Sequence, residues 1–144
     1  MAWAPAAGMS AGPFHFSMRV YWEDTDAAGI VFYANYLKFF ERARTEWLRS
    51  LGIEQQILRE STNGMFVVGD TALRYLRPAR LDDELLVTAV LQEAGRASMV
   101  IAQQALLLPE GTPLAEGTIR IGWVDATTFR PARIPPIILE SLKQ

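Results

Sequence analysis

The stretch WEDTDAAGIVFYANYLKFFERARTEW, from Trp22 to Trp47, joins an acidic loop to an amphipathic segment. Apolar side chains recur there every three or four residues, with charged side chains between them, and this spacing continues to Leu51. Because the spacing follows the 3.6-residue turn of an α-helix, it predicts a long helix with one apolar face. Asn35 is its expected cap and Gly52 its expected end. The apolar positions are Tyr36, Phe40, Ala43, Trp47 and Leu51.

Most of the remaining chain consists of segments typical of β-strands. They are rich in β-branched and aromatic residues, and turn-forming residues separate them. The links are short, which favours antiparallel neighbours. We expect strands at 14–22, 65–77, 84–93, 97–108 and 114–126, a short helical piece at 53–60, and a short helix or strand in the tail.

The wide apolar face of the long helix needs a cover, and only the strands can supply it. We therefore predict an α+β protein of the hotdog type, in which a curved antiparallel β-sheet wraps around one long central helix. A ferredoxin-like fold is the alternative, but it requires a second helix of similar length. Residues 1–13 are expected to form a flexible leader and residues 14–144 a single domain, which suits a chain of 144 residues.

Composition limits the possible chemistry. The chain has no cysteine and one histidine, His15, so thiol chemistry and cysteine-built metal sites are excluded, and we expect no metal and no cofactor. A formal net charge of −2 argues against nucleic-acid binding. Neither a secretory signal nor an apolar segment long enough to span a bilayer is visible, which predicts a cytoplasmic protein.

The acidic loop holds the best-placed candidates for catalysis. Asp24 and Asp26 precede Gly29, and the helix that follows begins with backbone N–H groups that have no partner within the helix. Such groups can hold a carbonyl oxygen while a nearby carboxylate attacks the carbonyl or activates a water. The alternative is that both aspartates only cap and solvate the loop. A G-x-S-x-G pattern around Ser10 lacks the strand and the helix that its mechanism requires.

Three segments resemble the 4-hydroxybenzoyl-CoA thioesterase family of hotdog proteins, and they look most similar to its branch associated with the Tol-Pal cluster. The segments are EDTDAAGIVFYANYLKFFERARTE at 23–46, FVVGDTALRYLRPARLDDELLV at 66–87 and VDATTFRPARIP at 124–135. The resemblance implies hydrolysis of an acyl-CoA thioester, with Asp26 as nucleophile or general base. It also implies that the backbone N–H near Tyr33 polarises the thioester carbonyl. Many Tol-Pal-type members have histidine where this chain has Tyr33, which argues against a mechanism that needs an imidazole there.

The resemblance further implies where substrate and subunits meet. Sites are expected between paired subunits, in a homodimer or homotetramer, with a second N–H donor around Met65. Gly29, Phe66 and Val67 are expected to contact substrate, and Met65 to Val68 would suit aliphatic and aromatic acyl groups equally.

Arginines are candidates for the phosphates of coenzyme A, because guanidinium groups bind phosphate with two hydrogen bonds. Arg77 and Arg80, at a turn, are preferred over Arg74, Arg130 and Arg133. A cluster of aromatic side chains either lines an acyl tunnel or packs in the core, and core packing is favoured for at least two of its three members. The cluster consists of Phe39, Phe40 and Trp47.

Two other functions remain open. A non-catalytic module that binds acyl-CoA or acyl carrier protein is the first, and carrier-protein thioesters also remain possible as substrates. A hotdog hydratase or dehydratase is the second. It usually requires an Asp/His pair, for which His15 is the sole and poorly placed candidate.

Overall fold

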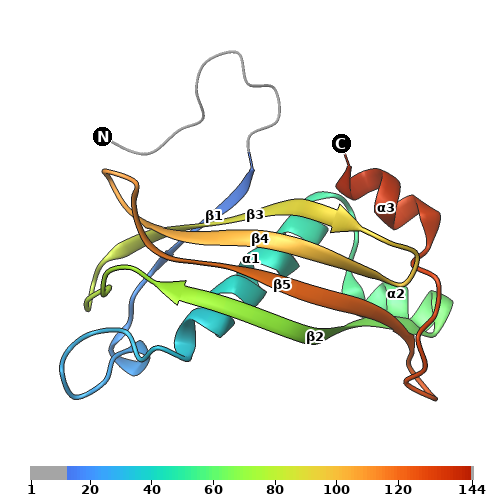
Figure 1. Ribbon diagram of the computed structural model, residues 1–144, viewed down its shortest axis with the longest axis horizontal. Coiled ribbons are helices and arrows are strands. Elements are labelled where there is room, and N and C mark those ends of the chain that lie inside the picture. The colour runs from blue at the N-terminus through green and yellow to red at the C-terminus, as the bar shows by residue number, and fades with distance from the viewer. Residues whose placement is uncertain (1–12, 144) are drawn as a thin grey trace, which may run out of the picture.

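The computed structural model describes residues 13–143 and shows one antiparallel sheet of five strands with one long helix packed against it (Figure 1). The order of strands across the sheet is β1-β3-β4-β5-β2. The strands are β1 (Phe14–Arg19), β2 (Gly64–Tyr75), β3 (Glu84–Ala94), β4 (Ser98–Leu107) and β5 (Thr112–Asp125). The helices are α1 (Asn35–Ser50), α2 (Gln55–Thr62) and α3 (Pro136–Leu142), and a short 3-10 turn, η1, spans Trp22–Asp24.

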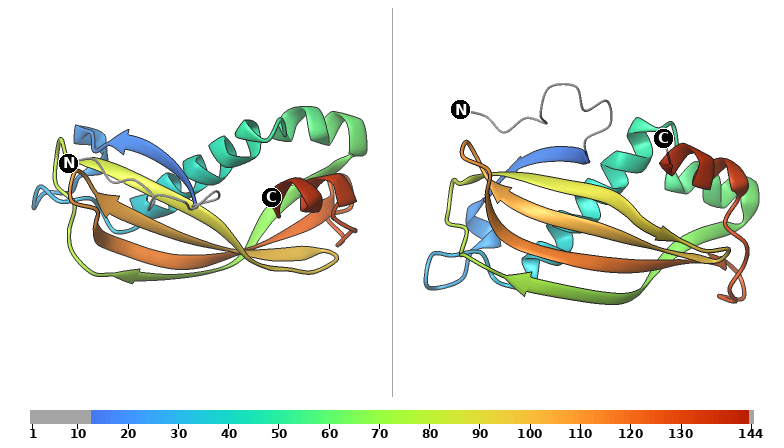
Figure 2. Two further views of the ribbon diagram at one scale, coloured as in Figure 1. Left: turned by 90° about the horizontal axis from the view of Figure 1, so that it is seen from above. Right: turned by 45° about the horizontal axis from the view of Figure 1, so that its top comes forward.

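The core lies between α1 and one face of the sheet. Figure 2 shows α1 running along that face of the twisted sheet. Phe39, Phe40 and Trp47 of α1 are 1%, 0% and 8% exposed, and they pack against strand residues such as Ile101 and Ile119. Burying each such side chain contributes about 1.5–3 kcal/mol, so this interface holds the domain together. The aromatic cluster is therefore core packing rather than the lining of a tunnel.

The predicted hotdog architecture is confirmed, and the ferredoxin-like alternative is excluded because α2 and α3 are short helices of 8 and 7 residues. The tail forms a helix. Gly52, with a φ of +81°, follows the last residues of α1 as expected. The expectation for the first strand was too long, because the chain leaves β1 at Arg19 and turns into η1.

The expected helix cap was wrong. Ala34 is the N-cap of α1 and offers no side-chain hydrogen bond, whereas Asn35 is the first helical residue. The Asn35 side chain instead donates from Nδ2 to the carbonyl oxygen of Asp24 at 2.9 Å. Tertiary contact with the acidic loop thus replaces local capping, and the amino-terminal end of α1 has no side-chain cap.

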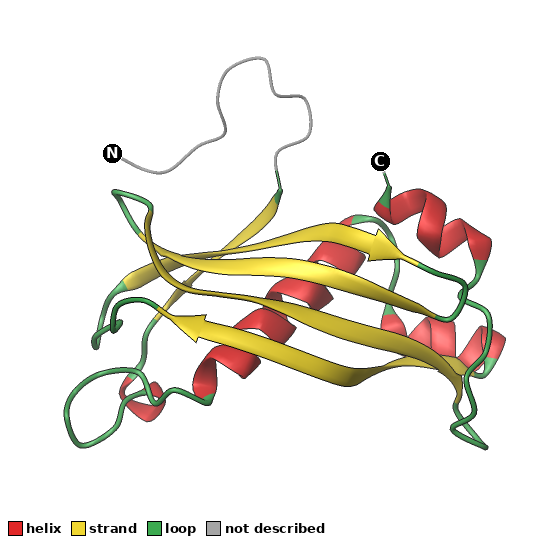
Figure 3. Cartoon of the chain, in the orientation of Figure 1, coloured by secondary structure: helices red, strands yellow, loops and turns green. Residues whose placement is uncertain are grey.

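Strand β2 lies at the edge of the sheet and pairs only with β5 in the part of the chain that the structure describes. Along this edge strand some apolar side chains are exposed, including Val68 at 54% and Tyr75 at 46%. The strand also connects two distinct ends of the domain. Figure 3 shows the loops that precede α1 at one end, and α2 with α3 at the other.

Residues 1–12 and 144 lie outside the described part, so the expected leader up to residue 12 and Ser10 are not tested. Among the helices within residues 13–143, none has the length and apolar character needed to cross a membrane.

Candidate active site

The acidic loop forms a small hairpin in front of α1. Thr25 pairs with Val31, and the N–H of Asp26 donates to the carbonyl of Ile30 at 2.9 Å. The N–H of Gly29 returns to the carbonyl of Asp26 at 3.0 Å. Gly29 has a φ of +79°, a conformation that side chains with a Cβ rarely adopt, which explains glycine at this turn.

The segment 79–80 anchors this hairpin to the sheet end. Val31 donates its N–H to the carbonyl of Ala79 at 2.9 Å, and Ile30 forms an antiparallel bridge with Arg80. Arg80 is itself held by Asp83, whose carboxylate accepts the Arg80 backbone N–H at 2.8 Å. The loop therefore has a defined position relative to α1 and to the end of β2.

The two aspartates of the loop have different roles. Asp24 is 6% exposed, and its Oδ2 accepts the backbone N–H of Tyr21 at 2.8 Å. Its carbonyl accepts hydrogen bonds from the Phe32 N–H at 3.0 Å and from the Asn35 side chain. Asp24 thus fastens the loop to α1, and the capping alternative is correct for this residue.

Asp26 is exposed at the tip of the hairpin. Its Oδ1 accepts the backbone N–H of Ala28 at 2.9 Å, which fixes the direction of the carboxylate. Within residues 13–143, Oδ2 accepts no hydrogen bond, so this oxygen is open to a reactant. The carboxylate is therefore oriented through Oδ1, while Oδ2 has no hydrogen-bond partner among the described residues.

Tyr33 lies in the turn that leads into α1. Among the hydrogen bonds of the described residues, none is donated by its backbone N–H, and no side chain caps the adjoining helix. The Tyr33 carbonyl accepts the hydroxyl of Tyr75 at 3.0 Å, and the two rings meet edge to face at 6.2 Å. The turn is thereby held against the end of β2 with its N–H free to bind an oxygen.

A pocket of about 240 Å³ lies beside this turn. Its lining is mostly apolar and aromatic, with the cationic side chain of Arg77 among it. Burial raises the pKa of both Tyr36 and Tyr75, so their phenols stay neutral at ordinary pH. The lining residues are Ile30, Val31, Tyr33, Tyr36, Tyr75, Leu76, Arg77 and Pro78.

The structure brings together only part of the expected site. Asp26, Gly29, Tyr33, Arg77 and Arg80 meet at the loop end of the domain. Phe66, Val67 and Met65 lie at the opposite end of β2. Met65 and Tyr75 are ten residues apart along the strand, which corresponds to about 33 Å. The expected site residues therefore form two groups at opposite ends of β2.

A second pocket, of about 210 Å³, lies at the Phe66 end between α1 and the sheet. Strand alternation places Phe66 and Val68 on the face toward α1 and Val67 on the other, although Val67 also borders the pocket. Sequence reasoning missed Arg44, which lines this pocket from α1. In the sequence, Arg44 follows Phe40 by four residues, a spacing that places its cationic side chain on the apolar face of α1. The lining residues are Glu41, Arg44, Thr45, Leu48, Gln55, Phe66, Val67, Val68 and Ile121.

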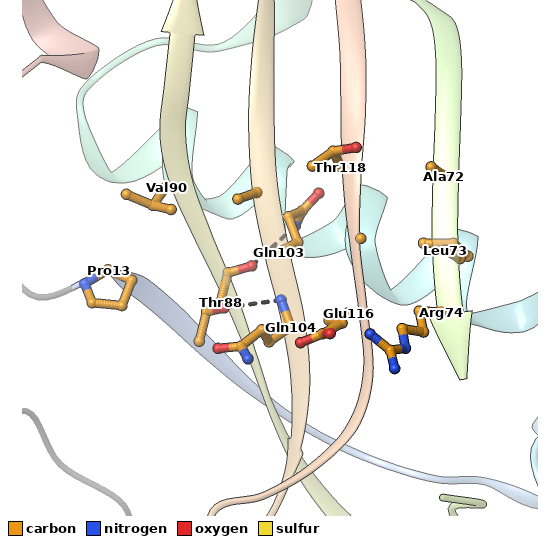
Figure 4. A pocket seen from close by; sticks show the side chains of 12 residues that line it. Pro13, Ala72, Leu73, Arg74, Thr88, Val90, Gln103, Gln104, Glu116 and Thr118 are labelled. Atoms are coloured by element: carbon orange, nitrogen blue, oxygen red, sulfur yellow. Dashed lines mark hydrogen bonds between the residues drawn. The ribbon is translucent and has the colours of Figure 1, made fainter. Parts of the chain in front are cut away.

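A third cavity, of about 520 Å³, lies over the outer face of the sheet (Figure 4). Arg74, Val90 and Thr118 line it from three strands, while α1 passes behind the sheet in this view. Arg74 is thus separated from Arg77 and from the pocket beside Tyr33. Arg130 adjoins the turn at Asp125, whose N–H donates to the Arg130 carbonyl at 2.9 Å, and it does not line the pocket beside Tyr33.

Comparisons with known proteins identify the family of this chain. Residues 20–142 match the family described as the thioesterase-like superfamily. The acyl-CoA thioesterase YbgC of Haemophilus influenzae is 42% identical over 122 residues, which cover 85% of this chain and 88% of the relative. The acyl-CoA thioester hydrolase YbgC of Escherichia coli is 38% identical, with 91% and 96% covered.

Solved structures agree as well. A probable thioesterase from Bartonella henselae superimposes with a TM-score of 0.81 at 30% identity, covering 86% of this chain and 100% of that one. A 1,4-dihydroxy-2-naphthoyl-CoA thioesterase from Synechocystis gives a TM-score of 0.85 at 20% identity, covering 92% and 97%, and supports the fold alone. The chain therefore belongs to the thioesterase-like superfamily of hotdog proteins.

Proposed function

We propose that this protein hydrolyses acyl-CoA thioesters, with Asp26 as the reacting carboxylate and the Tyr33 backbone N–H as a donor to the thioester oxygen. One observation carries the proposal. An exposed carboxylate with one open oxygen lies in the hairpin that leads directly into the turn at Tyr33, whose N–H is unbonded among the described residues at the uncapped amino-terminal end of α1. The partial positive charge of that helix end favours negative charge on oxygen.

The reaction follows from these two groups. As general base, Asp26 takes a proton from a water whose oxygen attacks the thioester carbon. The carbonyl oxygen becomes negative and is stabilised by the Tyr33 N–H. Collapse of this intermediate breaks the C–S bond, and the proton passes to the leaving thiolate, which gives free acid and CoA. As nucleophile, Asp26 would attack the carbon itself and expel the thiolate, which takes up a proton to give CoA. Water would then hydrolyse the resulting anhydride to free acid and the Asp26 carboxylate.

The second backbone N–H that would donate to the thioester oxygen comes, in this proposal, from a second subunit. Phe66 lies opposite Trp123, whose N–H and carbonyl bond to Ala97 and Ala132 instead of to β2. Because hydrogen-bonded pairs alternate along an antiparallel ladder, the Phe66 N–H points to the free edge of β2, whereas that of Met65 points to β5. Phe66 is therefore the better assignment for the donor expected around Met65.

Pairing of two β2 edges around a two-fold axis would bring together the two groups of site residues, those at the Tyr75 end of one strand and those at the Phe66 end of the other. An antiparallel partner places the Phe66 end of one strand beside the Tyr75 end of the other, which removes the separation of about 33 Å within one subunit. It also covers the exposed apolar edge. We propose this homodimer, with two sites between the subunits. The outer sheet face offers a surface for a tetramer.

Arg77 and Arg80 lie at the same end of the domain as the Asp26 hairpin and the turn at Tyr33. Arg77 lines the pocket beside Tyr33, and Arg80 is exposed next to the hairpin. We assign them to the phosphates of coenzyme A, because guanidinium groups bind such oxygens strongly.

The test is steady-state release of free thiol from a panel of acyl-CoAs of increasing length, followed with a thiol-detecting reagent. The proposal expects multiple turnovers per site with at least one member of the panel. A non-catalytic acyl-CoA binder would retain ligand without releasing CoA, and that result would refute the proposed activity. Acyl carrier protein thioesters in the same assay would show whether a carrier protein is also a partner.

A further inference from the structure

The pocket between α1 and the Phe66 end of β2 contains an oriented cation that the hydrolysis does not use. Arg44 donates from one terminal nitrogen to Oε1 of Gln103 at 2.9 Å. Gln103 is 1% exposed, and its Nε2 donates to the carbonyls of Phe40 at 3.0 Å and Thr88 at 3.2 Å. Figure 4 shows Gln103 and its bond to Thr88. A buried amide tied to both helix and sheet therefore sets the direction of the guanidinium.

Arg44 forms no direct ion pair within residues 13–143, and the carboxylate that acts on its charge is Glu41, which lines the same pocket. Within residues 13–143, no carboxylate lies within 4 Å of it, and Gln103 is its one hydrogen-bond acceptor. Burial lowers the pKa of Arg44, and the charge of Glu41 raises it only in part. Glu41 is exposed to solvent, which screens its charge. A partly buried guanidinium with unused donors is costly unless an anionic oxygen meets it.

The pocket has the size and lining of a short acyl site. Its volume of about 210 Å³ is close to the 240 Å³ of the pocket beside Tyr33. Leu48, Phe66, Val68 and Ile121 give it apolar walls. Arg44 is the cation among its lining residues and is partly buried, whereas the one acidic residue of the lining, Glu41, is exposed to solvent. These features suit an acyl chain of a few carbons whose far end carries negative charge.

We propose that this pocket receives the distal end of the acyl group and that Arg44 selects acyl groups ending in a carboxylate. The inference rests on the proposed function, because pairing of β2 edges places Phe66 and Val68 of one subunit beside the Asp26 hairpin of the other. The thioester would be cleaved at the hairpin while the acyl chain extends toward Arg44 across the interface. Arg44 is thus a specificity-determining residue that does not touch the reacting atoms.

Two isosteric substrates test the proposal. Glutaryl-CoA ends in a carboxylate, and 5-methylhexanoyl-CoA carries an isopropyl group in its place. We expect the wild-type protein to prefer glutaryl-CoA by about 10- to 100-fold in kcat/KM, the range that one charge-assisted hydrogen bond supplies. Arg44→Met should remove this preference by lowering kcat/KM for glutaryl-CoA alone, and Arg44→Lys should restore part of it.

Several other results would contradict the role of Arg44, and they can be distinguished from one another. Equal rates on the two substrates in the wild-type protein, with both cleaved, would overturn the selection while leaving the thioesterase intact. If Arg44→Met lowers both rates equally through KM, the cation binds a phosphate of coenzyme A instead. If Arg44→Met lowers both rates with loss of the dimer in sedimentation, Arg44 contacts the partner subunit instead. Failure of the wild-type protein to cleave any acyl-CoA would refute the proposed function rather than this inference alone.

Discussion

The proposed division of the site between two subunits leads to a quantitative prediction for mixed dimers. One subunit carries Asp26→Asn, which removes the reacting carboxylate. The other carries Val68→Trp, which fills the pocket beside Phe66 from the edge strand. Each variant alone should be inactive, because both of its sites have the same defect.

The expected activity of the mixed dimer follows from the separation of about 33 Å between the two ends of β2. Asp26 of one subunit must work with the pocket of the other. In a mixed dimer one site therefore carries both defects, while the second combines a normal Asp26 with a normal Val68. One of two sites is intact, so the mixed dimer should have half the wild-type kcat per dimer.

The two variants are co-expressed with different affinity tags and purified over both tags, which isolates mixed dimers. Native mass spectrometry then confirms their subunit composition. Thiol release is then measured at saturating acyl-CoA. If the sites were contained within single subunits, each site would carry one defect, and the mixed dimer would be as inactive as its parents. That result would refute the shared site.

Three further predictions concern the loop and the fold. Asp24→Ala should lower the free energy of unfolding by about 1–2 kcal/mol, measured by urea denaturation, because a backbone N–H in the preceding turn loses its acceptor. Backbone N–H groups of Thr128 and Thr127 lower the pKa of Asp125 below its ordinary value of 3.8. The charged form of Asp125 therefore stabilises the fold. This stabilisation is fully present above pH 3.8 and is lost as the pH falls through the lower pKa of the folded state. Asp125→Asn should therefore flatten the dependence of Tm on pH below about 4. Tyr33→Phe should change kcat less than about threefold, because only its backbone acts in the proposed reaction.

Periodicity in the sequence was enough to predict the sheet, the central helix and their contact. Alternation along the strands and the spacing from Tyr36 to Leu51 are local properties, so they survive without knowledge of the tertiary structure. The cap at Asn35 was mispredicted because its side chain bonds to Asp24, eleven residues away. Long-range hydrogen bonds of this kind leave no periodic signal.

The grouping of the candidate residues was predictable where one segment contains them. Asp26, Gly29 and Tyr33 follow one another in a single hairpin and turn, so their grouping is visible in the sequence. Phe66 reaches the proposed site only from a second subunit, which no single chain reveals. Arg44 was missed because a charged residue within a helix is ordinarily assigned to solvent, and only the structure shows its tie to buried Gln103.

The central claim is that the Asp26 carboxylate performs the chemistry. The most direct test compares the kcat of Asp26→Asn with that of Glu23→Gln, an exposed acid three residues earlier in the same loop. Both changes remove one negative charge with little change of shape. We expect Asp26→Asn to lower kcat by about a hundredfold or more, with Tm unchanged, and Glu23→Gln to keep wild-type activity. An Asp26→Asn protein that retains more than about a tenth of wild-type turnover would contradict the account.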